Sequence, residues 1–147
     1  VSFRLMSVDA GSKVHLEVLR SKDRLAFDIP VVQAPHEMDQ ITSLADPEKN
    51  LVRPLGIIGV EIDSKIAAMI DDLRDPFGLI VVARSTEAGA DIALNVADVI
   101  RTLNGQPMTT LDRLRSTLSA LQPGAPVVLQ IQRDQRLLYL AFTLDQP

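Results

Sequence analysis

Cysteine is absent from the 147 residues of this chain, which excludes disulfides, thiolate metal sites and a cysteine nucleophile. Aromatic residues make up only 3%, so the core must be built from Leu, Ile, Val and Ala. The longest unbroken apolar stretches, such as Leu79–Ala83, are too short to span a bilayer. No segment has the pattern of a signal peptide. Because the chain begins at Val1 rather than Met, we expect it to be a piece of a longer protein.

The charge and composition indicate a folded protein that does not bind nucleic acid. Apolar residues make up 46% and charged residues 23%, the usual balance of a globular domain. The formal net charge is −4, and no cluster of Lys and Arg with interleaved aromatics is present. A nucleic-acid partner would need a basic face for its phosphates.

The residues that catalysis or metal binding would need are missing or badly spaced. A Ser-His-Asp triad requires a His beside a nucleophile, but His15 falls on a predicted strand and His36 in a predicted loop. Neither lies near a Gly-flanked Ser. No His and carboxylate spacing suits a metal, the acidic group Asp71, Asp72 and Asp75 is typical of a solvated helix end, and phosphate-binding glycine loops are absent. We therefore predict no catalytic residue, metal ligand or cofactor in this chain.

An internal repeat relates the two ends of the chain. Shifting the sequence by 113 residues, the separation of Gly11 and Gly124, brings six identical pairs together without a gap. The matched residues are Leu5, Gly11, Val14, Leu16, Arg20 and Leu25 with Leu118, Gly124, Val127, Leu129, Arg133 and Leu138. The matches keep the period-2 alternation of a shared strand face, so each copy is predicted to be a helix end, a glycine turn and a β-hairpin.

The repeat divides the chain into unequal parts. Residues 1–31 are predicted to be the C-terminal half of a preceding domain, with the end of its helix at Val1–Met6. Residues 32–52 are predicted to be a linker with a short turn, because Pro35, Asp46, Pro47 and Asn50 punctuate them. Residues 53–147 are predicted to form one complete domain.

Local patterns in this domain predict an α+β fold. A Gly-punctuated apolar strand over 55–62 is followed by a helix that Asp63 or Ser64 caps, with Asp75-Pro76 at its end. Its apolar positions have helical spacing and are Ile66, Met69, Ile70 and Leu73. A short buried strand is predicted at Leu79–Ala83, then a small helix or loop at 87–94, and a tight primed turn at Asn104-Gly105.

The C-terminal segment predicts a helix followed by a hairpin. Thr109 or Thr110 caps the helix and Pro123-Gly124 ends it. Its apolar positions are Leu111, Leu114, Leu118 and Leu121. Asp134-Gln135 is predicted to lie at the hairpin tip. The whole reads as a small antiparallel sheet capped by two helices.

The order of these motifs resembles a PDZ domain of the bacterial HtrA/Deg serine proteases. The resemblance rests on Asp98-Val99-Ile100, Leu103-Asn104-Gly105, Pro123-Gly124 and Arg133-Asp134, with Leu55-Gly56-Ile57-Ile58-Gly59 similar to the carboxylate-binding loop. It covers roughly residues 53–144 and implies a small β-sandwich or partly open barrel capped by two helices, preceded by a partial second PDZ copy. The family usually has Gly where this chain has Ala97, so the backbone there is in question.

The resemblance implies a groove that receives a peptide as an added strand. The carboxylate-binding loop and groove strand would be Leu55, Gly56, Ile57, Ile58, Gly59 and Val60. Gly56 permits the close backbone approach that a terminal carboxylate needs. The groove helix would present Arg113, Leu114, Thr117 and Leu118.

The functional hypothesis is a peptide-binding module without catalytic residues that regulates an attached HtrA-type serine endopeptidase in protein quality control. Its partners would be exposed C-termini or unfolded substrates and its own protease domain, in the periplasm or cell envelope. Two alternatives stay open. In the first, the chain is a structural module of a protease cage that holds homo-oligomers together. In the second, it is the PDZ region of another envelope protease or of a secretion component.

Overall fold

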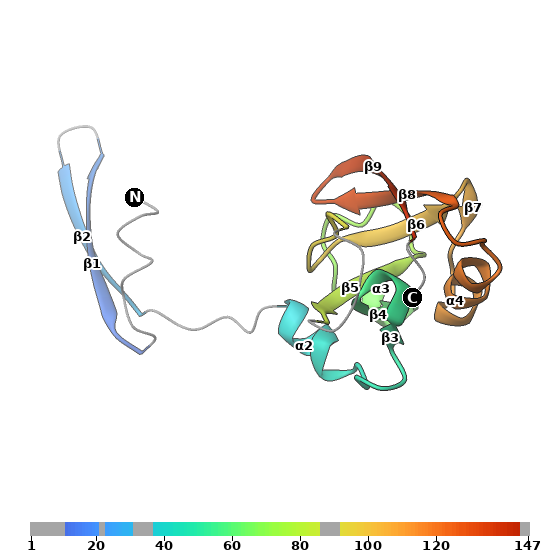
Figure 1. Ribbon diagram of the computed structural model, residues 1–147. Coiled ribbons are helices and arrows are strands. Elements are labelled where there is room, and N and C mark those ends of the chain that lie inside the picture. The colour runs from blue at the N-terminus through green and yellow to red at the C-terminus, as the bar shows by residue number, and fades with distance from the viewer. Residues whose placement is uncertain (1–10, 21–22, 31–36, 86–91, 145–147) are drawn as a thin grey trace. The chain divides into compact units, whose positions relative to one another are not determined.

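The computed structural model describes residues 11–20, 23–30, 37–85 and 92–144. The chain forms two compact units, Val1–Pro35 and His36–Pro147 (Figure 1). The helix end expected at residues 1–6, His36 and most of the stretch expected at 87–94 lie outside the described residues. The division at 31, 32–52 and 53 stays a prediction.

The first unit contains a β-hairpin that repeats the hairpin at the other end of the chain. Strand β1 (Lys13–Arg20) pairs antiparallel with β2 (Asp23–Pro30), and β8 (Pro126–Arg133) pairs in the same way with β9 (Arg136–Thr143). Every bound and every cross-strand partner is displaced by the 113 residues that separate Lys13 from Pro126. Gly11 and Gly124 both have positive φ, 91° and 75°. The repeat predicted from the sequence is therefore confirmed in these hairpins.

The second unit is built on one antiparallel sheet whose strands differ in length. Its further strands are β3 (Leu51–Val52), β4 (Ile57–Glu61), β5 (Leu79–Arg84), β6 (Val99–Leu103) and β7 (Gln106–Pro107). The strands lie in the order β3-β4-β5-β6-β8-β9, and β7 pairs with β6. Because β3 and β9 are the two ends of this order, the sheet does not close into a barrel. The predicted α+β class is confirmed.

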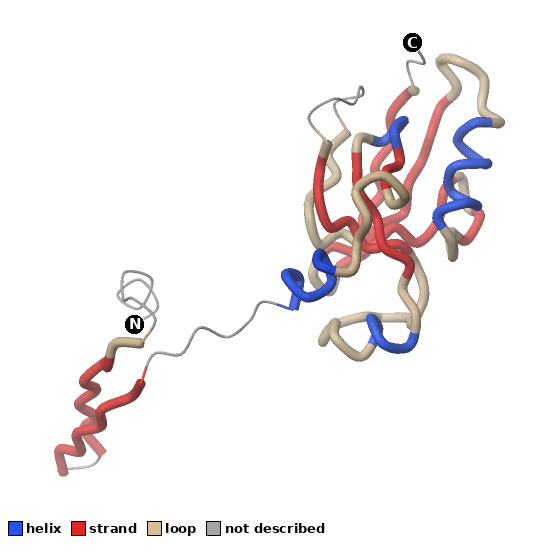
Figure 2. Tube along the Cα trace, turned by 90° about the horizontal axis from the view of Figure 1, so that it is seen from below, coloured by secondary structure: helices blue, strands red, loops and turns tan. Residues whose placement is uncertain are grey.

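Apolar residues of the helices pack on both faces of β4 and β5; Figure 2 shows the helices in blue and the strands in red. The helices are α2 (Glu37–Ser43), the 3-10 turn η1 (Arg53–Leu55), α3 (Ser64–Ala67) and α4 (Leu111–Ser119). Alternate side chains of β5 enter two apolar clusters: Val81 packs with α4, and Ile80 packs with Ile41 of α2 and Ile66 of α3. A strand buried on both faces reads as a continuous apolar run, which is what Leu79–Val82 is.

Two helix caps and one turn have the local structure that the sequence predicts. Asp63 caps α3, accepting from the N–H of Ile66 at 2.8 Å, and Thr110 caps α4, accepting from the N–H of Arg113 at 3.1 Å. Asn104 and Gly105 have φ of 48° and 81° between paired β6 and β7, as a primed two-residue turn requires. None of the helices within the described ranges has the length and apolar composition that crossing a membrane requires.

The helix after Asp63 is shorter than its apolar spacing predicts. The prediction of a helix through Leu73 is wrong, because α3 ends at Ala67. The carbonyl of Asp72 and the N–H of Arg74 instead bond the side chain of Gln132, at 2.6 and 3.1 Å. The guanidinium of Arg101 donates a hydrogen bond to the carbonyl of Asp75 at 2.7 Å. These distant partners bind the backbone of the segment after α3, so its polar groups are satisfied without a helix.

Candidate functional site

Strand β4 begins at a glycine whose backbone is left-handed. Gly56 has φ 61° and ψ 37° and ends η1, with its N–H donating to the carbonyl of Arg53 at 3.0 Å. Its own carbonyl accepts from the N–H of Ser85 at 2.8 Å. An L-residue with a Cβ adopts this conformation at a cost, so Gly56 allows the sharp entry into β4.

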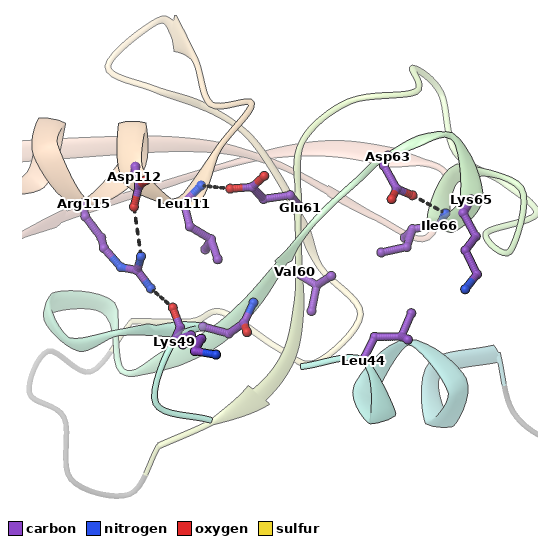
Figure 3. Close-up of a pocket in the computed structure, with 11 residues that line it drawn as sticks. Leu44, Lys49, Val60, Glu61, Asp63, Lys65, Ile66, Leu111, Asp112 and Arg115 are labelled. Atoms are coloured by element: carbon purple, nitrogen blue, oxygen red, sulfur yellow. Dashed lines mark hydrogen bonds and ion pairs between the residues drawn. The ribbon is translucent and has the colours of Figure 1, made fainter. Parts of the chain in front are cut away.

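Helix α4 is held against β4 from its first turn. The N–H of Leu111 donates to the carboxylate of Glu61 at 2.8 Å, which ties the end of β4 to the start of α4 (Figure 3). A Cβ built on Gly59 would lie 3.2 Å from Cδ2 of Leu111. The missing side chain at Gly59 therefore lets the helix approach the strand closely.

The structure brings the predicted strand and helix together but buries most of their side chains. Leu55, Ile57, Leu114 and Leu118 belong to one apolar cluster and are at most 2% exposed. On the opposite face of β4, Ile58 and Val60 pack with the cluster that contains α2 and α3. Whether these residues contact a ligand stays a prediction.

Arg113 and Thr117, the two polar residues predicted for the groove, lie on a side of α4 that does not face β4. Arg113 is exposed, and Thr117 is half-buried with its hydroxyl donating to the carbonyl of Arg113 at 2.8 Å. These residues are four positions apart and share one ridge of the helix. A second ridge carries Leu111 and Arg115, and this is the one that meets residues 49–51 beside β4.

One edge of β4 pairs with β5, and the other edge pairs with a segment of the chain that lies just upstream in the sequence. Leu51 and Val52 are the cross-strand partners of Ile58 and Ile57, and the N–H of Gly59 donates to the carbonyl of Asn50 at 3.0 Å. The side chain of Val52 is fully buried in the cluster that contains Leu55, Ile57, Leu114 and Leu118. We call residues Lys49–Val52 the upstream segment. It lies antiparallel to β4 beside α4.

Two side chains fasten the upstream segment. The guanidinium of Arg115 donates to the carbonyl of Leu51 from Nη2 at 3.1 Å and from Nε at 3.3 Å, and also to the carbonyl of Lys49 (Figure 3). The amide of Asn50 donates to the carbonyl of Gly59 at 2.8 Å and accepts from the N–H of Asp46 at 2.9 Å. Sequence reasoning missed Asn50 and Arg115. The only local signal is the apolar pair Leu51-Val52 directly before Arg53-Pro54.

The turn before the upstream segment is ordered by an aspartate. The carboxylate of Asp46 accepts from the N–H groups of Glu48 and Lys49 at 3.0 and 3.3 Å. The backbone hydrogen bonds, that from Lys49 first, lower the pKa of Asp46. This Asx turn starts the segment in a fixed direction.

An open pocket of about 490 Å³ continues the groove past the end of the upstream segment. It lies between the start of α4, β4 and α3 and is lined by Leu44, Lys49, Asn50, Val60, Glu61, Asp63, Lys65, Ile66, Leu111, Asp112 and Arg115 (Figure 3). Two of its cations are paired, Lys49 with Asp46 at 3.4 Å and Arg115 with Asp112 at 3.2 Å. Such exposed pairs contribute little to stability. Among the described residues, no three His, Asp or Glu side chains gather where a metal ion would bind.

The fold and this groove define a small α+β domain in which an extended segment pairs with a strand edge beside a helix. In a comparison with known families, residues 56–144 match the PDZ domain. The chain belongs to the PDZ domain family.

Curated relatives place the similarity among periplasmic proteases. The chain is 31% identical over 123 residues to the periplasmic pH-dependent serine endoprotease DegQ of Escherichia coli, which covers 82% of this chain and 26% of the relative. It is 29% identical to a probable periplasmic serine endoprotease DegP-like of Chlamydia muridarum, covering 83% and 24%. The chain thus spans about a quarter of the length of these relatives.

Solved structures of low sequence identity share the fold. The HtrA-type protease AlgW with decapeptide has a TM-score of 0.55 and 16% identity, over 92% of this chain and 42% of that one. The expected resemblance to the PDZ region of HtrA/Deg serine proteases is confirmed by these matches.

Proposed function

We propose that residues 53–147 are a module that captures exposed C-termini or extended segments of substrate proteins. One observation carries the proposal: the edge of β4 beside α4 accepts an extended segment, with an apolar side chain buried between strand and helix. The upstream segment does this in the structure. A ligand strand would use the same ladder geometry, main-chain hydrogen bonds for affinity and a side-chain pocket for selectivity.

The residues of the ligand site follow from this geometry. The backbone of Leu55, Gly56 and Ile57 would receive a terminal carboxylate, and Ile58, Gly59 and Val60 would pair with the ligand. The last side chain of the ligand would take the place that Val52 fills, between Ile57 and the pair Leu114 and Leu118. Arg113, on the exposed side of the same helix, would attract the carboxylate at longer range by its positive charge.

The proposed setting of the module is a larger protease. The curated relatives are periplasmic serine endoproteases, and this supports a parent protein that is an HtrA-type serine endopeptidase in the periplasm or cell envelope. The module would regulate the attached protease domain in protein quality control. The segment proposed here has no catalytic role of its own.

The first unit is proposed to be the end of a preceding PDZ domain. Its hairpin has the bounds and register of β8–β9, yet its apolar residues are partly exposed, Phe27 by 49% and Ile29 by 47%. In the second unit, the equivalent face packs on the main core. An apolar face of this kind requires a cover, which supports a tandem pair of domains and keeps oligomerisation as an alternative function.

A peptide titration tests the binding function. The probe is a fluorescent peptide with the sequence Asp46–Val52 and a free terminal carboxylate, because this sequence already fits the groove. We expect an affinity on the order of micromolar, which corresponds to about −8 kcal/mol. The matched control is the same peptide with an amidated C-terminus. Equal binding of both would contradict carboxylate capture, and binding of neither at millimolar peptide would contradict the module itself.

A further inference from the structure

The groove that would bind a ligand is already filled by the chain's own backbone. The upstream segment runs antiparallel to β4, with Val52 opposite Ile57 and Leu51 opposite Ile58. These are the positions that the last two residues of a C-terminal peptide would take in strand addition. The side chain of Val52 is 0% exposed and fills the place between β4 and α4. A ligand and the upstream segment therefore cannot occupy this edge together.

We propose that the upstream segment is a tethered pseudo-ligand that closes the groove of this domain, and that substrate peptides bind only when it is displaced. This inference rests on the proposed peptide-binding function. The chain continues through η1 directly into β4, so the segment is joined to the site that it occupies. A competitor on such a short tether has an effective concentration of about a millimolar.

The contacts of the segment divide into an outer part that can release first and an inner part that a ligand displaces last. The side chain of Val52 lies in the core, whereas Lys49 is exposed and Leu51 and Asn50 are only half-buried. The fasteners of this outer part are the Arg115 guanidinium and the Asn50 amide. Release therefore begins at Lys49–Leu51, next to the open pocket that Lys49, Asn50 and Arg115 line.

This arrangement gives the pocket a role in displacement. A ligand strand entering along β4 first meets Val60 and Glu61, beyond the last ladder bond from Gly59 to Asn50. From there it can replace the upstream segment one ladder position at a time. The apparent dissociation constant equals the intrinsic one divided by the open fraction of the domain. If the segment's own intrinsic dissociation constant is about 10–100 μM and its effective concentration about a millimolar, closure weakens ligand binding by about tenfold to hundredfold.

A reversible covalent lock tests the proposal. Leu51 and Ile58 are direct cross-strand partners, close enough in such a pair for a disulfide, and the chain has no other cysteine. In the double variant Leu51→Cys with Ile58→Cys, we expect the oxidised form to bind the Asp46–Val52 peptide at least tenfold more weakly than the reduced form. The single variant Leu51→Cys, treated with the same oxidant and reductant, is the control.

A second variant opens the groove without a crosslink. Arg115→Ala removes the guanidinium that donates to the carbonyls of Lys49 and Leu51, and we expect about tenfold tighter peptide binding, because hydrogen bonds from a charged donor are the stronger ones. Arg136→Ala removes an equal charge from β9 and should leave the affinity unchanged. Circular dichroism checks that each variant is folded.

The outcomes separate this proposal from the function on which it rests. Weaker binding of the oxidised lock together with tighter binding of Arg115→Ala supports the pseudo-ligand. Equal affinity of oxidised and reduced forms overturns it while leaving peptide binding intact. If the reduced double variant, Arg115→Ala and the unmodified chain all fail to bind, the peptide-binding function itself is wrong.

Discussion

Replacing Ala97 by Gly should stabilise the second unit. Ala97 is an exposed residue with φ 73°, a conformation that costs an L-residue about 1–2 kcal/mol. Its N–H donates to the carbonyl of Val81 at 2.8 Å, and the next residue, Asp98, is 1% exposed and pairs with Arg133 at 2.8 Å. These contacts hold the backbone of Ala97 in place, and a glycine would keep them all.

The gain follows from two opposing terms. Glycine removes the left-handed strain but adds about 0.4–1 kcal/mol of conformational freedom to the unfolded chain. We therefore expect Ala97→Gly to raise the free energy of unfolding by about 0.5–1 kcal/mol. For a domain of this size the corresponding rise in Tm is roughly 2–5 °C, which differential scanning calorimetry resolves.

The matched control is Ala120, an exposed residue with ordinary φ −80° that ends α4. There the same Ala→Gly change relieves no strain, so it should lower the free energy of unfolding by about 0.5–1 kcal/mol. Opposite signs at the two positions are the expected result. A loss of stability at both would refute the conclusion that Ala97 is strained.

Two other substitutions test the second unit and the hairpin of the first. Gly78→Ala should cost at least about 2 kcal/mol, because Gly78 has φ 129° and a Cβ there would lie 2.8 Å from the carbonyl oxygen of Ile100; denaturant unfolding measures it. In the β1–β2 hairpin, the hydrogen bond that the His15 ring donates to the Asp28 carboxylate raises the pKa of His15 above 6.5. A pKa raised by folding means that the pair stabilises the hairpin fully below pH 6.5 and loses that effect as the pH rises through the raised value, so NMR titration should show Asp28→Asn lowering the pKa of His15.

Patterns within a few residues were enough to predict much of this fold. The Asn104-Gly105 turn, the Thr110 cap and the C-terminal hairpin depend on neighbours in the chain, and the structure has them as expected. The family usually has glycine at the position of Ala97, and the backbone there is indeed left-handed, a conformation that favours glycine. Each of these is a local preference that tertiary contacts do not oppose.

The parts that the sequence did not predict depend on distant partners. The segment after α3 is not helical where the pattern predicts a helix, and its backbone at Asp72 is bound by Gln132, 60 residues further along the chain. The upstream segment lies within residues 32–52, where the pattern predicts only a linker, and its place is set by Arg115, 64 residues beyond Leu51. A helical wheel cannot show which ridge of α4 meets residues 49–51, so the contacts of Arg115 with Lys49 and Leu51 had no signal in the sequence.

The two hairpins have the same strand register, and at one pair of equivalent leucines the residue is the same while its burial differs. Leu16 and Leu129 are equivalent in the repeat, but Leu129 is 0% exposed and Leu16 is 37% exposed. Leu129→Ala should therefore cost about 2–5 kcal/mol of unfolding free energy, and Leu16→Ala less than about 1 kcal/mol. Thermal unfolding of both variants, with hydrogen exchange at the hairpin amides, measures the difference. If Leu16→Ala costs as much as Leu129→Ala in this chain, the first hairpin is already covered by this chain or a second copy of it, and the alternative of an oligomerisation module gains the support that the tandem-domain proposal loses.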